Sequence, residues 1–529
     1  MPFRPFSTTN ATALLAAILL SRPLHNHLAV FLLLVSVLFC TSMLIQSALS
    51  RFACLPTLLV MIYFLIYNII PALFQVGLDT YFWRLLTYDE TTTSAVAALT
   101  LLFLVCFALG QALASDRHYA SALATIRDSE GRGRTLTLAV VAVIAFLVGT
   151  VPVRLFGVSS MMQSRGTLSE LVFAGLDPAG IGLFVFLPRA ILFTGFILII
   201  YGLTRRRSAA GALDRYAVFL PLFLLLLPLQ MIVNFPGAQS RFWLFGMLIT
   251  LGLMFVSFGS VGRRLLLIAV FVIGTFTVFP ISQQINRKEG FNFDIELPKV
   301  EEFLTHGDVD GFQSTMNTFV YVNQFGHTYG RQIASAILFF VPRSIWSGKS
   351  AATGSVTSEA LGFRFNNLSA PIIAELYIDG SFIAVIFGAL ALGYGYRRLD
   401  YLFTAANDIG GVTLYRVLLA LICGFTIILM RGSLLGVMAP IAPSVGVILA
   451  TIHGPAVGLP AHAPTTPGTG GGEGLEAASF PSTRTAVEAR PGVEPQSCTL
   501  SRGGAASERA PQGSTVDDPL RRAGMPTPS

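Results

Sequence analysis

The stretch Leu28-Ala-Val-Phe-Leu-Leu-Leu-Val-Ser-Val-Leu-Phe-Cys-Thr-Ser-Met-Leu-Ile45 contains no acidic, basic or histidine residue. An apolar run of about 20 residues can cross the hydrocarbon core of a bilayer as a helix, which pairs its own backbone groups. Similar runs recur along the chain, and together they predict transmembrane helices. We place these near 11–21, 28–45, 53–74, 93–114, 135–153, 179–203, 216–234, 241–258, 263–283, 369–395, 412–430 and 434–452.

The overall composition supports the same fold class. Hydrophobic residues make up 53% of the 529 residues and charged residues only 12%, whereas a soluble domain carries about 25% charged residues. We therefore predict an all-α integral membrane protein, a polytopic bundle of about twelve transmembrane helices with one large loop. The net charge of +7 comes from residues between apolar runs, which favours a role in topology and contact with lipid over nucleic-acid binding.

Basic residues predict how the bundle is oriented. They gather in connections of the same parity, at 117–134, 205–215, 263–264 and 397–398. Connections rich in Lys and Arg face the cytoplasm. Both termini are therefore expected in the cytoplasm, and the large loop outside.

The chain divides into four parts by composition. Residues 1–283 hold about nine spans, 284–368 form the large outside loop, 369–452 hold about three more spans, and 453–529 form a tail rich in Pro, Gly, Ala, Ser and Thr. The tail has too few large apolar residues to fold, so we expect it to be disordered. Within the loop, residues around 328–345 are amphipathic and predict an interfacial helix, while Asp308 and Asp310 read as solvated charges.

Several basic residues lie where an outside connection should have few. A guanidinium at the end of a span can reach the lipid head groups, which is the simplest explanation for any one of them. Taken together they favour a function, because guanidinium groups match phosphate oxygens in a bidentate way. The residues are Arg154, Arg165, Arg189, Arg241, Arg331, Arg343, Lys349, Arg364 and Arg431.

Two acids mark the start of the long apolar run that follows the loop. Glu375 and Asp379 are four residues apart and share one face of a helix. They are either acids favoured by the dipole at the start of their own helix, or groups that pair with the arginines or bind a sugar hydroxyl. Tyr377 between them offers an aromatic face to a sugar, and His327 is either a structural histidine or a catalytic one. No phosphate-binding loop, dinucleotide fingerprint or metal-ligand spacing is present in the sequence, so we expect no metal and no cofactor.

Four segments resemble one family. They are Phe339-Phe-Val-Pro-Arg-Ser-Ile-Trp-Ser-Gly-Lys349, Ala374-Glu-Leu-Tyr-Ile-Asp-Gly380, Gly237-Ala-Gln-Ser-Arg241 and Arg431-Gly-Ser433. They look like motifs of the bacterial O-antigen polymerases, also called oligosaccharide repeat-unit polymerases or Wzy proteins. The resemblance covers mainly residues 330–435, and Ser350 stands where the family usually has proline.

The resemblance implies a function and a location. Such enzymes are metal-independent glycosyltransferases of the bacterial inner membrane with a large periplasmic loop, and they resemble other all-helical, lipid-dependent glycosyltransferases. They transfer a growing glycan from undecaprenyl pyrophosphate to the next lipid-linked repeat unit, together with a chain-length regulator and a flippase. Phosphate binding would fall to Arg241, Arg343 and Arg431, then to Arg165, Arg189 and Lys349. Glu375, Asp379 or His327 would orient or deprotonate the acceptor.

Three other functions remain open at this point. An O-antigen ligase uses the same chemistry but moves the glycan onto lipid A core. A transporter or flippase of the lipid-linked unit would also use arginines, although transporters more often have two related halves and charges near the bilayer midplane. An assembly component of the membrane is the fourth possibility.

Overall fold

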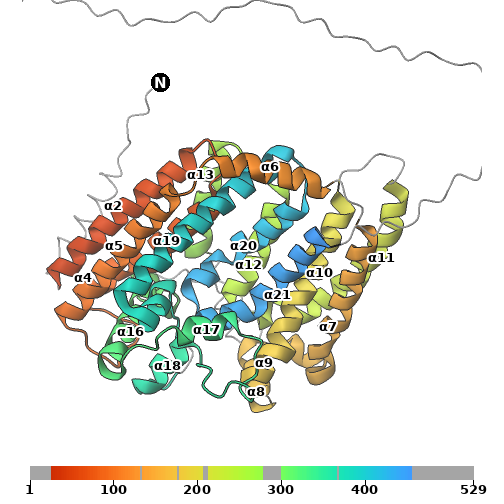
Figure 1. Cartoon of the computed structure of the whole chain (residues 1–529). Helices are drawn as coiled ribbons and strands as arrows, with labels where there is room; N and C mark the ends of the chain where they lie inside the picture. The colour runs from red at the N-terminus through yellow and green to blue at the C-terminus, as the bar shows by residue number, and fades with distance from the viewer. Residues whose placement is uncertain are drawn as a thin grey trace, which may run out of the picture. The chain divides into compact units, whose positions relative to one another are not determined.

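The computed structural model describes residues 26–130, 134–175, 178–205, 212–277, 300–365 and 368–454. All of these belong to one compact unit, residues 1–461. Every regular element in the described ranges is helical (Figure 1). The span expected at 11–21 and the tail after residue 454 lie outside the described residues.

Nine helical segments within the described ranges are long and apolar enough to cross a membrane. This confirms the helical membrane fold, and each segment matches one of the predicted spans. They are α2 (His27–Leu49), the run from α3 through η1 to α4 (Leu55–Gly77), α5 (Glu90–Ala112), α7 (Thr135–Met161), η2 with α10 (Gly182–Thr204), α11 (Ala212–Val233), α19 (Ile372–Ile409), α20 (Leu414–Arg431) and α21 (Leu434–His453).

Two of the expected spans form shorter helices. The first is α12 (Arg241–Phe255), with 15 residues, and the second is α13 (Val261–Phe276), with 16 residues. At 1.5 Å per residue each is about 22–24 Å long, less than the hydrocarbon thickness of about 30 Å. α12 packs along α20, and α13 lies against α2 and α3.

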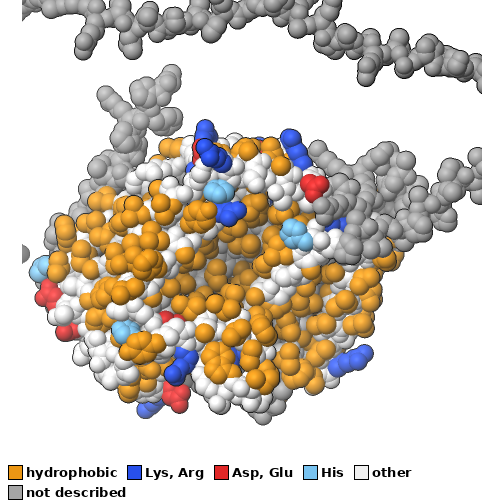
Figure 2. Space-filling view, in the orientation of Figure 1, with side chains coloured by type: hydrophobic (Ala, Val, Ile, Leu, Met, Phe, Trp, Pro, Cys, Tyr) orange, Lys and Arg blue, Asp and Glu red, His pale blue; other side chains and the backbone are white. Residues whose placement is uncertain are grey.

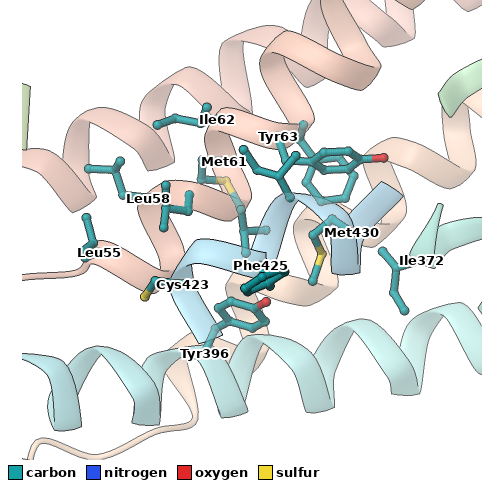
Figure 3. Packing of buried hydrophobic residues seen from close by; sticks show 14 of the residues in the cluster. Leu55, Leu58, Met61, Ile62, Tyr63, Ile372, Tyr396, Cys423, Phe425 and Met430 are labelled. Atoms are coloured by element: carbon teal, nitrogen blue, oxygen red, sulfur yellow. The ribbon is translucent and has the colours of Figure 1, made fainter. Parts of the chain in front are cut away.

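The centre of the bundle is the run Leu55–Gly77. Of its most apolar window, 89% is buried by other helices. Figure 3 shows how α3, α19 and α20 meet there through Met61, Tyr396, Cys423 and Phe425. A π-helical turn, η1 (Phe64–Ile69), interrupts this central run.

One end of the bundle, here called the basic end, collects arginines from connections far apart in sequence. Arg264 donates to the backbone oxygens of Ser50 (2.8 Å) and Phe52 (2.7 Å). Arg397 donates to the sulfur of Cys54 (3.2 Å), and Arg51 pairs with Asp116. The amphipathic helix α6 (Arg117–Glu130) packs against α19 and crosses this end (Figure 1). Connections predicted to share one side of the membrane are thus adjacent in the fold.

The opposite end, here called the loop end, carries residues 300–365 and 368–371. They form α15 (Val300–Leu304), η5 (Gly307–Val309), α16 (Gly311–Phe325), α17 (Arg331–Ile337) and α18 (Thr353–Ala360). Every residue from Gly311 to Thr318 is buried, because α16 packs against α5 and α19. Much of the expected loop therefore belongs to the folded bundle, and the helix expected over 328–345 is only the seven residues of α17.

Helix α19 is broken near the loop end. Gly380 and Ser381 leave helical geometry, and Ser381 has a φ of 58°. The carbonyl groups that the break releases are bonded by the turn before α17: Thr328 N donates to Ile378 O (2.8 Å) and Gly330 N to Asp379 O (3.2 Å). Irregular backbone at membrane depth needs such partners, since lipid offers none.

At the basic end, α19 holds the start of α3. Asp400 is fully buried and accepts hydrogen bonds from the backbone N–H (3.1 Å) and the hydroxyl (2.6 Å) of Thr57. A carboxylate here satisfies a first-turn N–H group and favours the positive end of the helix dipole.

Candidate functional site

Arg241 forms a bidentate ion pair with Asp308 at the loop end. Its two terminal nitrogens lie 2.7 and 2.9 Å from the carboxylate oxygens. Both side chains are only 14% exposed. Arg241 begins α12 because Ser240 caps this helix, accepting a hydrogen bond from Trp243 N (3.3 Å).

Arg431, the last residue of α20, holds the same segment of the loop. It donates to the backbone oxygens of Gly307 (2.8 Å) and Asp308 (2.9 Å), and to a carboxylate oxygen of Asp310 (3.1 Å). Its guanidinium also lies 4.7 Å above the ring of Phe242. We call Arg241, Arg431, Asp308 and Asp310 the arginine–aspartate cluster.

Asp310 completes this cluster from a buried position. It is 1% exposed and also accepts hydrogen bonds from Trp83 Nε1 (2.9 Å) and Ser369 Oγ (2.7 Å). The expectation that Asp308 and Asp310 are solvated is therefore wrong. Sequence reasoning treated them as loop charges because their partners, at positions 241 and 431, are distant in the chain.

The local charges fix the ionisation of Asp308. Burial raises the pKa of its carboxyl, but a hydrogen bond with His306 and the charges of Arg241 and Arg431 together bring the pKa below the usual range. Asp308 is thus negative at neutral pH, and the cluster places two carboxylates against two guanidinium groups.

Glu375 and Asp379 both sit at the N-termini of neighbouring helices. Glu375 is 1% exposed and accepts from Ser433 Oγ (2.7 Å) and Leu434 N (3.1 Å), the start of α21. Asp379 accepts from the backbone N–H groups of Gln332 (3.0 Å) and Ile333 (2.7 Å), the start of α17. Their spacing places them on one helix face, as predicted, but each carboxylate stabilises a different helix.

His327 and Tyr377 lie together beside the break in α19. His327 Nδ1 is 3.1 Å from the backbone oxygen of Tyr377. Tyr377 is 4% exposed, stacks on Phe319 at 5.2 Å and meets Phe382 edge-on. Its ring therefore lies among protein side chains. The most exposed aromatic residue nearby is Tyr329, at 87% exposure and with a φ of 51°, which no sequence signal indicates.

Lys349 and Arg343 differ in their surroundings. The ammonium group of Lys349, 8% exposed, donates to the backbone oxygens of Leu338 (3.1 Å), Phe339 (2.7 Å) and Val341 (2.8 Å). Burial and the charge of Arg343 lower the pKa of Lys349. Arg343 is exposed and donates to Ser350 O (3.1 Å).

Arg189 has a buried guanidinium that pairs with no acidic residue in the part of the chain that the structure describes. It follows the π-helical turn η2 (Gly182–Phe186) near the start of α10 (Leu187–Thr204). The residue is 5% exposed, and its Nε and Nη2 atoms make no hydrogen bond in the structure. No ion pair with a described acidic residue involves Arg189. The positive charge of Arg165, an exposed residue at the start of α8 (Arg165–Gly175), acts on it repulsively.

Arg189 lies at the same end of the bundle as the arginine–aspartate cluster. Asn234 Nδ2 donates to Arg189 O (3.3 Å), and Asn234 Oδ1 accepts from Trp243 Nε1 (3.3 Å), two residues after Arg241. An unpaired charge in a protein interior costs several kcal/mol. Among the described residues at this end, Arg189 is thus the one whose burial an anion would most clearly offset.

The described residues form no metal site, and comparisons with known proteins identify no relative. Among the described residues, no three His, Cys, Asp or Glu side chains are grouped closely enough to hold a metal ion. Comparisons with protein-family models, with curated proteins and with solved structures return no match. The function is therefore inferred from the site together with the sequence motifs described above.

Proposed function

We propose that this protein is a glycosyltransferase that polymerises oligosaccharide repeat units carried on undecaprenyl pyrophosphate. In this proposal it spans the bacterial inner membrane about twelve times, with the loop end in the periplasm and both termini in the cytoplasm. The arginines gathered at the basic end support that orientation. The products would be O-antigen or other surface polysaccharide.

The observation that carries the proposal is the buried guanidinium of Arg189, which no described acidic residue neutralises. In a glycosyl transfer, an acceptor hydroxyl oxygen bonds to the anomeric carbon of the donor sugar. The bond from that carbon to the pyrophosphate breaks, and the leaving group departs with the electron pair. Positive charge fixed in a low-dielectric site stabilises this developing charge without a metal, and an anion would in turn pay for the burial of Arg189.

The hydroxyl proton needs an acceptor, and the geometry favours His327 among the three candidates. Both carboxylates already accept hydrogen bonds from helix N-termini. His327 Nδ1 faces the carbonyl of Tyr377, so it carries the proton in this arrangement. A neutral imidazole then leaves Nε2 free to accept another proton.

The surface offers a route for lipid-linked substrates. Figure 2 shows a hollow in the apolar face of the bundle, between α19 and α21. A carrier whose prenyl chain stays in the bilayer could approach the loop end from this side. All candidate arginines also gather at one end, which favours a transferase over a flippase with charges near the midplane.

The proposal can be tested in the native host. We expect Arg189→Ala and Arg189→Gln to abolish long-chain polysaccharide while single repeats still reach lipid A core. Arg84→Ala, which changes an exposed arginine in the connection before α5, is the matched control and should leave chain length unchanged. Normal chain length in both Arg189 variants would overturn the proposed site.

The same experiment separates the alternatives. Loss of every glycan on lipid A core, including single repeats, would identify a ligase instead. Accumulation of lipid-linked units on the cytoplasmic side would identify a flippase. Radiolabelled undecaprenyl-linked repeat units and purified protein in liposomes would then show directly whether chains lengthen.

A further inference from the structure

The segment that follows α17 exposes an unusual run of apolar side chains. Between residues 337 and 346 the exposed fractions are 60% for Ile337, 39% for Leu338, 67% for Phe340 and 78% for Ile345. The segment is no longer helical, since α17 ends at Ile337. Hydrophobic side chains cover the surface where α17 lies in Figure 2.

Lys349 satisfies backbone carbonyl groups of this segment. Its ammonium group lies beneath the run and donates to three carbonyl oxygens, those of Leu338, Phe339 and Val341. Backbone bonds within the segment add Val341 N to Leu338 O (3.0 Å) and Trp346 N to Pro342 O (3.0 Å). Carbonyl groups that are satisfied internally can enter an apolar phase, whereas unsatisfied ones cannot.

The charges of the segment match a phospholipid surface. From residue 331 to 349 the sequence contains Arg331, Arg343 and Lys349 and no acidic residue. Arg331 and Arg343 are exposed. Arg343 follows Pro342 among the apolar side chains, in the position of a cation that reaches head-group phosphates from an interfacial segment.

The neighbouring helices point to the same partner. α17 packs against α19 and α21, two of the apolar helices. On α19, Ile383 and Phe387 are each 68% exposed, as expected of side chains that face lipid. The exposed run at 337–346 thus continues a surface that the bilayer covers.

We propose that residues 337–346 form a wedge that inserts into the bilayer surface at the loop end. Ile337, Phe340 and Ile345 lie among the acyl chains, and Arg343 binds lipid phosphate. Lys349 is a positioning residue that keeps the non-helical backbone of the wedge in shape. This inference concerns the membrane surface and does not depend on the proposed enzymatic function.

The test measures how close the wedge lies to acyl chains. Cys498 is changed to serine, and the four described cysteines are buried, so Phe340→Cys can be labelled with bimane in the full-length protein. The labelled protein is placed in nanodiscs of phosphatidylethanolamine and phosphatidylglycerol with brominated acyl chains. Phe387→Cys serves as the lipid-facing reference, and Glu359→Cys on α18 as the exposed reference outside the apolar run.

We expect the label at 340 to be quenched to within about twofold of the label at 387, and much more than the label at 359. Lys349→Met should reduce quenching at 340 and leave it unchanged at 387, and Lys349→Arg should restore it. Arg343→Glu should also reduce quenching at 340. Quenching at 340 no greater than at 359, with strong quenching at 387, would overturn the wedge and indicate a water-exposed or protein-binding segment.

Discussion

Arg431 Nη2 and Asp310 Oδ1 lie 3.1 Å apart and join the end of α20 to the start of α16. The pair is separated by 121 residues in the chain, and Asp310 is 1% exposed. The contact joins the region expected as a free loop to the membrane-spanning bundle. It therefore fixes the position of the loop residues that form the candidate site.

Breaking this contact should destabilise the protein strongly. Asp310→Ala removes the acceptor that Arg431, Trp83 and Ser369 share, and removal of one partner of a buried ion pair costs about 3–5 kcal/mol. We expect a clear fall in the midpoint of thermal unfolding in detergent, measured by fluorescence. Asp79→Asn, at an exposed acid of the same end, is the control and should change the midpoint little; an equal midpoint in both variants would show that the pair contributes nothing.

Replacing Arg189 should have the opposite effect on stability. Arg189→Met removes a buried charge that pairs with no described acidic residue and keeps an unbranched, apolar side chain in its place. We expect the ligand-free variant to be more stable than the original protein by about 1–4 kcal/mol, while polysaccharide chain extension is lost. A variant that is both less stable and inactive would indicate that Arg189 has a structural role instead.

Ligand binding should depend on the same residue. A ligand that binds only the folded state raises its stability with concentration. We expect undecaprenyl phosphate, and more weakly inorganic pyrophosphate, to raise the unfolding midpoint of the original protein and not that of Arg189→Met. Equal shifts in both proteins would place the anion elsewhere, with the arginine–aspartate cluster as the next site to test.

Glu375 can be tested as a helix cap against its predicted catalytic role. Glu375→Gln keeps an oxygen that can accept from Ser433 and Leu434, whereas Glu375→Ala removes it. As a cap, the alanine variant should lose about 1–2 kcal/mol of stability and the glutamine variant much less, with chain extension retained by the latter. A stable but inactive glutamine variant would instead identify Glu375 as the base.

The pH dependence of stability should reveal the state of Asp308. Its pKa is lower in the folded protein than the ordinary value of 3.8, so its stabilising contribution is fully present above that value and is lost as the pH falls through the folded pKa. The stability difference between the original protein and Asp308→Asn should therefore be constant from neutral pH to about pH 5 and shrink below about pH 4. A difference that already shrinks near pH 6 would contradict the lowered pKa.

Helices in this protein were predictable because hydropathy is a local property. The run Leu28–Ile45 lies within α2, and the predicted span at 434–452 nearly coincides with α21 (Leu434–His453). The prediction of twelve spans goes further than the nine long apolar helices of the described residues. α12 and α13 are shorter than a full crossing. The basic residues in their first turns, such as Arg263 and Arg264 in α13, do not indicate the length of either helix.

Partners of the candidate residues were much harder to predict. The sequence could identify Arg241 and Arg431 as unusual, but not that Asp308 and Asp310 face them, since these contacts join segments 67 and 121 residues apart. Likewise, the four-residue spacing of Glu375 and Asp379 predicted a shared face correctly, while the helix starts that they cap belong to other segments. Nothing in the sequence distinguishes Arg189, whose Nε and Nη2 have no acceptor among the described residues, from arginines whose partners are backbone carbonyls, such as Arg416.

Helix α19 has a consequence for the order in which the protein matures. Its three buried acids satisfy the N-termini of three other helices: Glu375 that of α21, Asp379 that of α17 and Asp400 that of α3. Asp400 is made 343 residues after Thr57, so during synthesis Thr57 lacks this acceptor until α19 has been made. A nascent chain halted before residue 400 should therefore remain sensitive to membrane proteases. The chain should become resistant when α19 has inserted.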